Sequence, residues 1–234
     1  MEKSKNVEFL CAEHEMLPHV QAVLNGEYEP FITFSCDKSA VFCDIGACYG
    51  SFVFWSALIK KWEVKYHCYE PNPKVIEVLT KNINMIKKEG ISVEIFNKAV
   101  IGNDREEKTL MLYSGKYNIG EASVNPKIVE TLYGKLDVND TLSEIDHVEV
   151  STIKVSDLGN PILVKIDTEG CEVEIIESFL EKEIPPKIFM AEYHSSSDRD
   201  KIYELLMEKY TKIAERGRID TGIVIYSRDY VKYP

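Results

Sequence analysis

VFCDIGACYG, residues 41–50, begins as a continuous apolar run and ends in an acidic residue and a loop that holds two glycines. A short apolar run of this kind is typical of a strand that is buried on both faces of a sheet. In open α/β sheets, ligands bind beyond the carboxyl ends of such strands. The stretch therefore predicts a buried strand followed by a loop that binds a nucleotide-like ligand.

Strands and helices alternate along most of the chain after this stretch. The expected strands are 40–45, 66–70, 91–100, 161–167, 187–194, 211–217 and 222–229. The expected helices are 51–62, 73–88, 170–183 and 197–210. This alternation predicts parallel pairing in a doubly wound α/β sheet with helices on both faces. The last two strands have no helix between them, so we expect them to form an antiparallel edge hairpin.

The helix expected at 73–88 has the clearest boundaries in the sequence. Asn72 is a suitable cap, and Pro73 is suited to a first helical turn. Lysines at the end of the stretch favour the negative end of the helix dipole, and Gly90 follows as a stop signal. The pattern therefore fixes both ends of this helix.

Two segments depart from the alternation. Residues 102–160 combine short alternating pieces with many turn residues, which predicts a β-rich insertion with a mobile loop around 114–126. Residues 1–39 precede the first clear strand. We therefore expect a cap segment over 1–39 and one domain over 40–234, with the cap and the insertion covering the substrate site.

Charge and hydropathy narrow the class of partner. The chain has 39 acidic and 28 basic residues and a net charge of -11, whereas proteins that track phosphates depend on Lys and Arg. No apolar run approaches the roughly 18 residues of a membrane span, and the first residues do not resemble a signal peptide. We therefore expect a cytoplasmic protein that binds neither nucleic acid nor membrane.

The six cysteines stand at 11, 36, 43, 48, 68 and 171 and form no CxxC pair. Metal or redox chemistry is one reading of such residues, and buried reduced thiols are the other. The absence of paired spacing favours reduced thiols, in keeping with an intracellular context.

The spacing of the glycine loop indicates which ligand it holds. A dinucleotide fingerprint places a second glycine two positions after the first, to let the backbone approach a pyrophosphate. Cys48 occupies that position here, between Gly46 and Gly50. Glu70 follows Gly50 by twenty residues, where a carboxylate can accept both ribose hydroxyls. Ribose without pyrophosphate favours S-adenosylmethionine (SAM) over a nicotinamide dinucleotide.

Four motifs, DIGACYG, YEPNP, NKAV and VKIDTEGCE, together resemble the FkbM family of SAM-dependent methyltransferases. The resemblance runs from about Val41 to about His194, and KIDTEG is its most specific part. It implies a Rossmann-like class I methyltransferase fold, with a mostly parallel seven-stranded sheet and an antiparallel last strand. It also implies O-methylation of a hydroxyl on a small molecule or sugar. Cys48 departs from the family pattern, which often has Asn there.

The resemblance also assigns expected roles to individual residues. The loop residues expected to line the methionine part of SAM are Asp44, Gly46, Ala47 and Gly50. Glu70 is expected to hold the ribose, and Asn97, Lys98 and Ala99 to lie near the adenine. Asp167 and Glu169 are expected to face the methyl group or the substrate.

An alcohol is a poor nucleophile at neutral pH, so a general base should assist the transfer. The candidates are Asp167, Glu169, Glu192 and His194, the last two on one face of a strand end. We expect Asp167, Glu169 and His194 to be catalytic.

Four alternatives stay open. Lys165 and Asp167 could only pair with their neighbours, while Glu169 starts the next helix. The carboxylates could bind a divalent cation, although nothing in their spacing demands one, and we expect no metal. A nicotinamide-dependent oxidoreductase and a SAM-binding module without catalysis are the rival functions. Base N-methylation is disfavoured because no Asn-Pro-Pro motif occurs.

Overall fold

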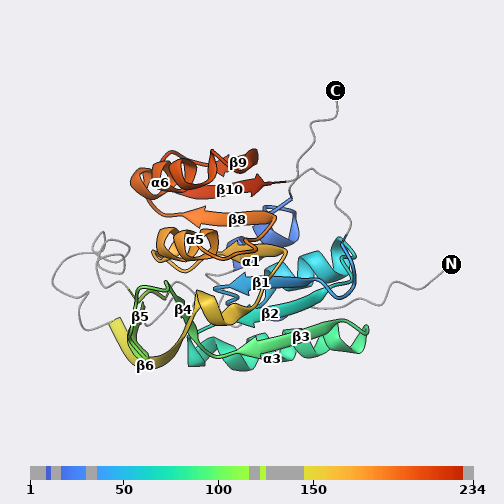
Figure 1. Ribbon diagram of the computed structural model, residues 1–234. Helices are drawn as coiled ribbons and strands as arrows, with labels where there is room; N and C mark the ends of the chain where they lie inside the picture. Colours follow the sequence, from blue (N-terminus) through green and yellow to red (C-terminus); the bar gives the residue numbers. More distant parts are fainter. Residues whose placement is uncertain (1–8, 12–16, 30–35, 116–121, 125–144, 229–234) are drawn as a thin grey trace.

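The computed structural model describes residues 9–11, 17–29, 36–115, 122–124 and 145–228. Its main sheet consists of β1 (Val41–Ile45), β2 (Lys65–Tyr69), β3 (Ser92–Phe96), β7 (Leu163–Ile166), β8 (Ile188–Tyr193), β9 (Thr211–Gly217) and β10 (Gly222–Ser227). The strand order is β3-β2-β1-β7-β8-β10-β9 (Figure 1). The first five strands in this order pair parallel with one another, and β10 is antiparallel to both β8 and β9. The expected doubly wound sheet is confirmed, with β9 as the edge strand of the closing hairpin.

Helices cover both faces of this sheet (Figure 1). They are α1 (Leu17–Leu24), α2 (Ser51–Phe54), the π-helical turn η1 (Trp55–Ile59), α3 (Pro73–Lys88), α5 (Glu172–Leu180) and α6 (Ser196–Leu206). Phe42 of β1 packs with residues of α2 and α3 in one hydrophobic core, and Cys43 packs with residues of α5 and α6 in another. Because successive side chains of a strand point to opposite faces, β1 joins the two cores.

The boundaries expected for α3 are confirmed. The Asn72 side chain accepts a hydrogen bond from the Lys74 N–H at 3.0 Å, and Pro73 is the first helical residue. The helix ends at Lys88, and Gly90 has a φ of 85°, a left-handed conformation that glycine adopts readily.

The helix expected at 51–62 ends earlier and changes its hydrogen-bond pattern. The Lys60 N–H donates to the Trp55 carbonyl, five residues back, and Lys61 has a φ of 60°. The left-handed residue ends the helix, so it spans 51–59 as α2 and η1.

The single strand expected at 91–100 is two strands in different sheets. After β3, the Asn97 side chain donates to the carbonyl oxygens of Glu70 and Pro71 at 2.8 and 2.9 Å. The chain turns there, and β4 (Ala99–Ile101) pairs parallel with β6 (Ile145–Lys154) in a second sheet. The sequence pattern missed this break because apolar residues resume at Ala99, directly after Asn97 and Lys98.

The second sheet has the order β4-β6-β5, with β5 at Thr109–Gly115. The strands β5 and β6 pair antiparallel, as expected for hairpin-like strands in the insertion. Of the loop predicted around 114–126, two residues belong to β5, and Ser123 bridges to Tyr113. Residues 116–121 and 125–144 lie outside the described residues. Within the described ranges, no helix has the length and apolar character needed to cross a bilayer.

Candidate active site

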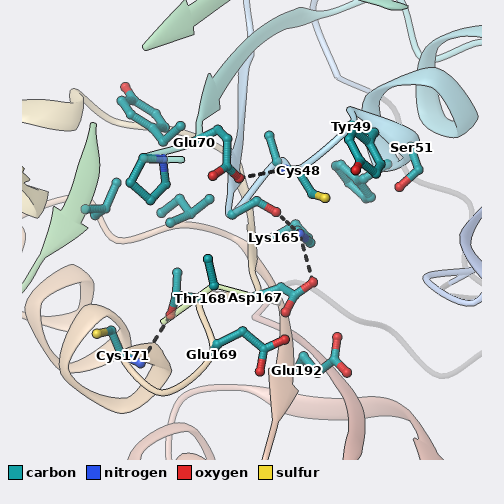
Figure 2. A pocket seen from close by; sticks show the side chains of 18 of the residues that line it. Cys48, Tyr49, Ser51, Glu70, Lys165, Asp167, Thr168, Glu169, Cys171 and Glu192 are labelled. Carbon is teal, nitrogen blue, oxygen red and sulfur yellow. Dashed lines mark hydrogen bonds and ion pairs between the residues drawn. The ribbon is translucent and has the colours of Figure 1, made fainter. Parts of the chain in front are cut away.

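A cavity of about 250 Å³ lies at the carboxyl ends of the central strands. The loops after β1, β2, β7 and β8 contribute to its lining, together with α1, the start of β4 and Leu112 of the second sheet. Figure 2 shows Glu70 on one side of this space, and Asp167, Glu169 and Glu192 together on another. The cavity therefore joins the two groups of residues that the sequence placed at the cofactor and at the acceptor.

The loop after β1 packs directly against the end of β7. The backbone N–H groups of Gly46 and Ala47 both donate to the Tyr69 carbonyl, at 2.9 and 3.1 Å. Gly46 has a φ of 75°, and a Cβ there would lie 1.7 Å from the Asp167 carbonyl oxygen. Only glycine allows this approach, so Gly46 fixes the distance between the two loops.

Glu70 binds the glycine loop from the end of β2. One carboxylate oxygen accepts the backbone N–H of Cys48 at 2.8 Å (Figure 2). The other accepts the backbone N–H of Asn72, also at 2.8 Å. Burial raises the pKa of Glu70 to about 7, although these hydrogen bonds oppose the shift. Cys48 has a φ of 45°, a conformation that Asn adopts more easily than Cys. The hydrogen bond to Glu70 therefore holds the backbone of Cys48, the loop residue at which the resemblance leads one to expect Asn.

Lys165 is a buried cation between two carboxylates. Its Nζ atom donates to the Gly46 carbonyl at 2.6 Å and lies 3.3 Å from both Asp44 Oδ1 and Asp167 Oδ2. Burial opposes the charge, but Asp167, Asp44 and Glu192 outweigh it and raise the pKa of Lys165. Burial also raises the pKa of Asp44 to about 6, against the attraction of Lys165. The ion pairing of Lys165 and Asp167, which the sequence left open, is therefore present.

Three carboxylates and one histidine form what we call the acidic wall, which consists of Asp167, Glu169, Glu192 and His194. His194 Nδ1 lies 3.3 Å from Glu169 Oε2, and His194 Nε2 lies 3.8 Å from Asp167 Oδ1. Burial, with the charge of Asp167, raises the pKa of Glu192. The three general-base candidates that we expected to be catalytic therefore lie together.

Glu172 is a residue of this site that the sequence reasoning missed. It is 1% exposed, and it accepts the Thr168 N–H at 2.7 Å, the Thr168 hydroxyl at 2.9 Å and the Gly170 N–H at 3.0 Å. α5 starts at Glu172 and not at Glu169, whose φ of 56° is left-handed. The sequence does contain a signal for this role, because Thr168 and Glu172 flank the start of a helix and Thr–Glu pairs often cap helices.

The cavity brings together most of the residues predicted for the site. Those that line it are Gly46, Ala47, Glu70, Lys98, Ala99, Asp167, Glu169 and His194. Asp44, Gly50 and Asn97 do not line it. Asp44 is buried beside Lys165, and a Cβ on Gly50 would lie 2.9 Å from the Leu79 side chain. The Asn97 side-chain amide donates to backbone carbonyls. Asp44, Gly50 and Asn97 therefore stabilise the loops around the cavity and do not line it.

The amino-terminal segment also contributes to the lining, through His19, Val20, Val23, Glu27 and Tyr28. Arg216 of β9 donates hydrogen bonds to the backbone carbonyls of Glu27 and Glu29, which holds this segment over the sheet. The Tyr28 ring is 1% exposed, and its centroid lies 5.9 Å from Lys165 Nζ. The sequence predicted a covering role for residues 1–39 but named no residue there.

The sequence family described as "Methyltransferase FkbM domain" matches residues 44–217. Among curated proteins, none matches this sequence. The fold is similar to that of the methyltransferase FkbM from Methylobacillus flagellatus KT, with a TM-score of 0.55 and 14% identity. That match covers 85% of this chain and 45% of the other, so this chain spans less than half the length of that protein.

Two further solved structures are similar at lower scores. The precorrin-6y C5,15-methyltransferase from Geobacter metallireducens GS-15 has a TM-score of 0.45 and 11% identity, and the match covers 95% of this chain and 92% of that one. The magnesium protoporphyrin IX methyltransferase from Synechocystis PCC 6803, solved with bound SAM, has a TM-score of 0.44 and 9% identity. That match covers 90% of this chain and 80% of the other.

Proposed function

Because this chain belongs to the FkbM methyltransferase family, which its residues 44–217 match, we propose that it transfers a methyl group from SAM to a hydroxyl oxygen on a small molecule or sugar. The observation that carries the proposal is the shared cavity of Glu70 and the acidic wall. A cofactor carboxylate site and a cluster of candidate bases open into one space.

The residues at the Glu70 end fit the nucleoside part of SAM. A carboxylate oxygen has two lone pairs, and each Glu70 oxygen accepts one backbone N–H. Each oxygen therefore keeps a lone pair for a ribose hydroxyl. Tyr69, Ala99 and Val100 line the cavity nearby and give it the apolar surface that an adenine ring requires.

The acidic wall fits the acceptor side of the reaction. SAM supplies a methyl group on a positively charged sulfur, and its transfer to oxygen is an in-line displacement. The chain must therefore place a hydroxyl behind the methyl carbon and receive its proton, and Asp167, Glu169 and His194 surround the space for both tasks. A net charge of -11 supports a small-molecule or glycan acceptor over nucleic acid.

The amino-terminal segment is proposed to act as a cap over this space. Five residues between His19 and Tyr28 line the cavity, and Arg216 holds the backbone beside them. Residues 1–39 would then limit which acceptors enter, while residues 40–234 form the methyltransferase domain.

The reaction class can be tested with SAM and a panel of hydroxylated small molecules and sugars. Formation of S-adenosylhomocysteine would be followed together with the mass and the NMR spectrum of the product. We expect a new methyl ether. A product methylated on nitrogen or carbon would contradict O-methylation while leaving SAM use intact.

The cofactor affinity is expected to rise with pH between 6 and 8. Burial raises the pKa of Glu70 to about 7, and ribose hydroxyls donate better to the ionised carboxylate. Binding should therefore release a proton below this pKa, and the affinity at pH 6 should be up to about tenfold weaker than at pH 8. Calorimetry at pH 6, 7 and 8, in buffers of different ionisation enthalpy, measures both quantities.

Replacement of Glu70 by Gln provides the matching variant. A hydrogen bond to a charged group contributes about 1.5–3 kcal/mol, so Glu70→Gln should weaken SAM binding roughly tenfold to a hundredfold and remove the pH dependence. Glu94→Gln, on the exposed side of the neighbouring β3, serves as the control and should change neither. A wild-type affinity that falls as the pH rises would exclude Glu70 from the ribose site.

A further inference from the structure

Three side chains of the acidic wall have the arrangement of a metal site. Asp167, Glu192 and His194 each offer one ligand atom, and these atoms lie within 4.8 Å of one another. Asp167 follows β7, while Glu192 and His194 come from the end of β8, its parallel neighbour. Adjacent strand ends therefore bring together two carboxylates and one imidazole that are distant in the sequence.

The orientation of His194 is the second observation. Its Nδ1 atom lies 3.3 Å from Glu169 Oε2, while its Nε2 atom is buried and has no hydrogen-bond partner within the described part of the chain. A histidine that binds a metal through one nitrogen usually gives the other to a carboxylate, which fixes the ring. Glu169 is in the place of that carboxylate, and the buried Nε2 atom lies 3.8 Å from Asp167 Oδ1 and 3.7 Å from Oε1 of Glu172, whose carboxylate already accepts backbone N–H groups.

The negative charge of the carboxylates around these residues favours a bound cation. Lys165 is in contact with the wall, but it is also bound to Asp44 and to the Gly46 carbonyl. Glu192 lines the cavity and makes no hydrogen bond or ion pair with any described residue. Glu27 of the amino-terminal segment also lines the cavity. Lys165 therefore shares its charge between Asp44 and the acidic wall.

We propose that Asp167, Glu192 and His194 bind one divalent transition-metal ion through Asp167 Oδ1, a Glu192 oxygen and His194 Nε2. Bonds of about 2.0–2.2 Å place ligand atoms on opposite sides of an ion about 4.4 Å apart and neighbouring ligand atoms closer. The 3.8 Å between His194 Nε2 and Asp167 Oδ1 suits such a pair. An imidazole beside two carboxylates favours ions such as Mn²⁺ or Zn²⁺ over Ca²⁺ and Mg²⁺, which prefer oxygen ligands.

The ion would have a role on the acceptor side, and this consequence rests on the proposed function. Three protein ligands leave coordination positions open towards the cavity, as in catalytic metal sites. An acceptor hydroxyl bound there would be oriented and would lose its proton more readily. An acceptor with two neighbouring oxygens, such as a vicinal diol of a sugar, could occupy two open positions.

The test uses the full chain freed of metal by a chelator and titrated with Mn²⁺ alone. Electron paramagnetic resonance measures the free ion, and calorimetry gives the affinity. We expect one Mn²⁺ per chain, bound more tightly than Mg²⁺ or Ca²⁺. Loss of a residue that only orients a ligand weakens metal binding about 10- to 100-fold, so His194→Ala and Glu192→Gln should each weaken it at least that much.

Exposed residues of the same types provide matched controls. His147→Ala on β6 and Glu177→Gln on α5 lie outside the cavity and should leave Mn²⁺ binding unchanged. Circular dichroism checks that each variant is folded. Absence of saturable Mn²⁺ binding, or binding that neither His194→Ala nor Glu192→Gln weakens, would overturn the proposal.

SAM binding to the same metal-free sample separates this inference from the proposed function. SAM binding without Mn²⁺ uptake would reject the metal site and leave the methyltransferase function intact. Mn²⁺ uptake that depends on His194, without SAM binding, would support the site and reject the function.

Discussion

Asp167→Asn should lower turnover on an identified acceptor by roughly two to four orders of magnitude, the range expected when an acid–base group is lost. Its affinity for SAM should stay within a few fold of the wild-type value. Asp167 is 27% exposed at the side chain and lines the cavity beside Glu192 and His194, away from Glu70. The change keeps the shape of the side chain but removes the charge that we propose acts on the acceptor, directly or through a bound ion.

Steady-state kinetics and calorimetry on the same preparation measure the two effects. Asp157→Asn is the matched control, because Asp157 is exposed on the 3-10 turn η3 (Val155–Leu158) and does not line the cavity. It should keep both the turnover and the affinity. An Asp167→Asn enzyme that turns over at nearly the wild-type rate would remove Asp167 from the reaction.

The second large effect concerns stability. Lys165→Met should lower the free energy of unfolding by about 3–5 kcal/mol at pH 8, because removal of one partner of a buried ion pair leaves the other charge uncompensated. Lys165 is 5% exposed at the side chain, and Asp44 beside it is fully buried with no hydrogen bond to its oxygens from the described residues. Urea denaturation measures the change.

The pH dependence of this loss has a defined sign. Burial raises the pKa of Asp44 to about 6, so its ionised form opposes folding, and that opposition is present above this pH and absent well below it. The loss in Lys165→Met should therefore shrink as the pH falls towards 5. The double variant Lys165→Met with Asp44→Asn should recover much of the stability at pH 8, because removal of both partners is often neutral.

Replacement of an exposed lysine serves as the control for the effect of Lys165→Met on stability. Lys212 pairs with Glu215 on β9 with 43% of its side chain exposed, so Lys212→Met should change the free energy of unfolding by no more than about 0.5 kcal/mol. A Lys165→Met protein as stable as this control, or as unstable at pH 5 as at pH 8, would refute the role given to Lys165.

The fold could be predicted where the signals were local. The cap Asn72 and the first-turn Pro73 fixed the start of α3, and the apolar run at 41–45 fixed β1, because each signal lies within a few residues of its effect. The strand break at Asn97 could not be predicted, since it depends on carbonyls of Glu70 and Pro71 that are distant in the sequence. Such partners become visible only when the strands are side by side.

In the candidate site, too, some residues could be predicted from local sequence signals and others could not. Asp167 and Glu70 could be predicted because each follows a strand, and the ends of parallel strands meet at one edge of the sheet. The role of Glu172 could not, because it depends on the left-handed turn at Glu169 and Gly170 that brings backbone N–H groups onto its carboxylate. Likewise, Tyr28 reaches Lys165 across a distance that no sequence pattern encodes.

Calorimetric titration of the purified chain with SAM, S-adenosylhomocysteine and NAD tests the central claim most directly. The spacing from Gly46 to Gly50 and the carboxylate of Glu70 in the same cavity favour a ribose without a pyrophosphate. We expect both adenosyl ligands to bind and NAD to show no comparable binding. Micromolar binding of NAD together with no binding of SAM or S-adenosylhomocysteine would contradict the assignment.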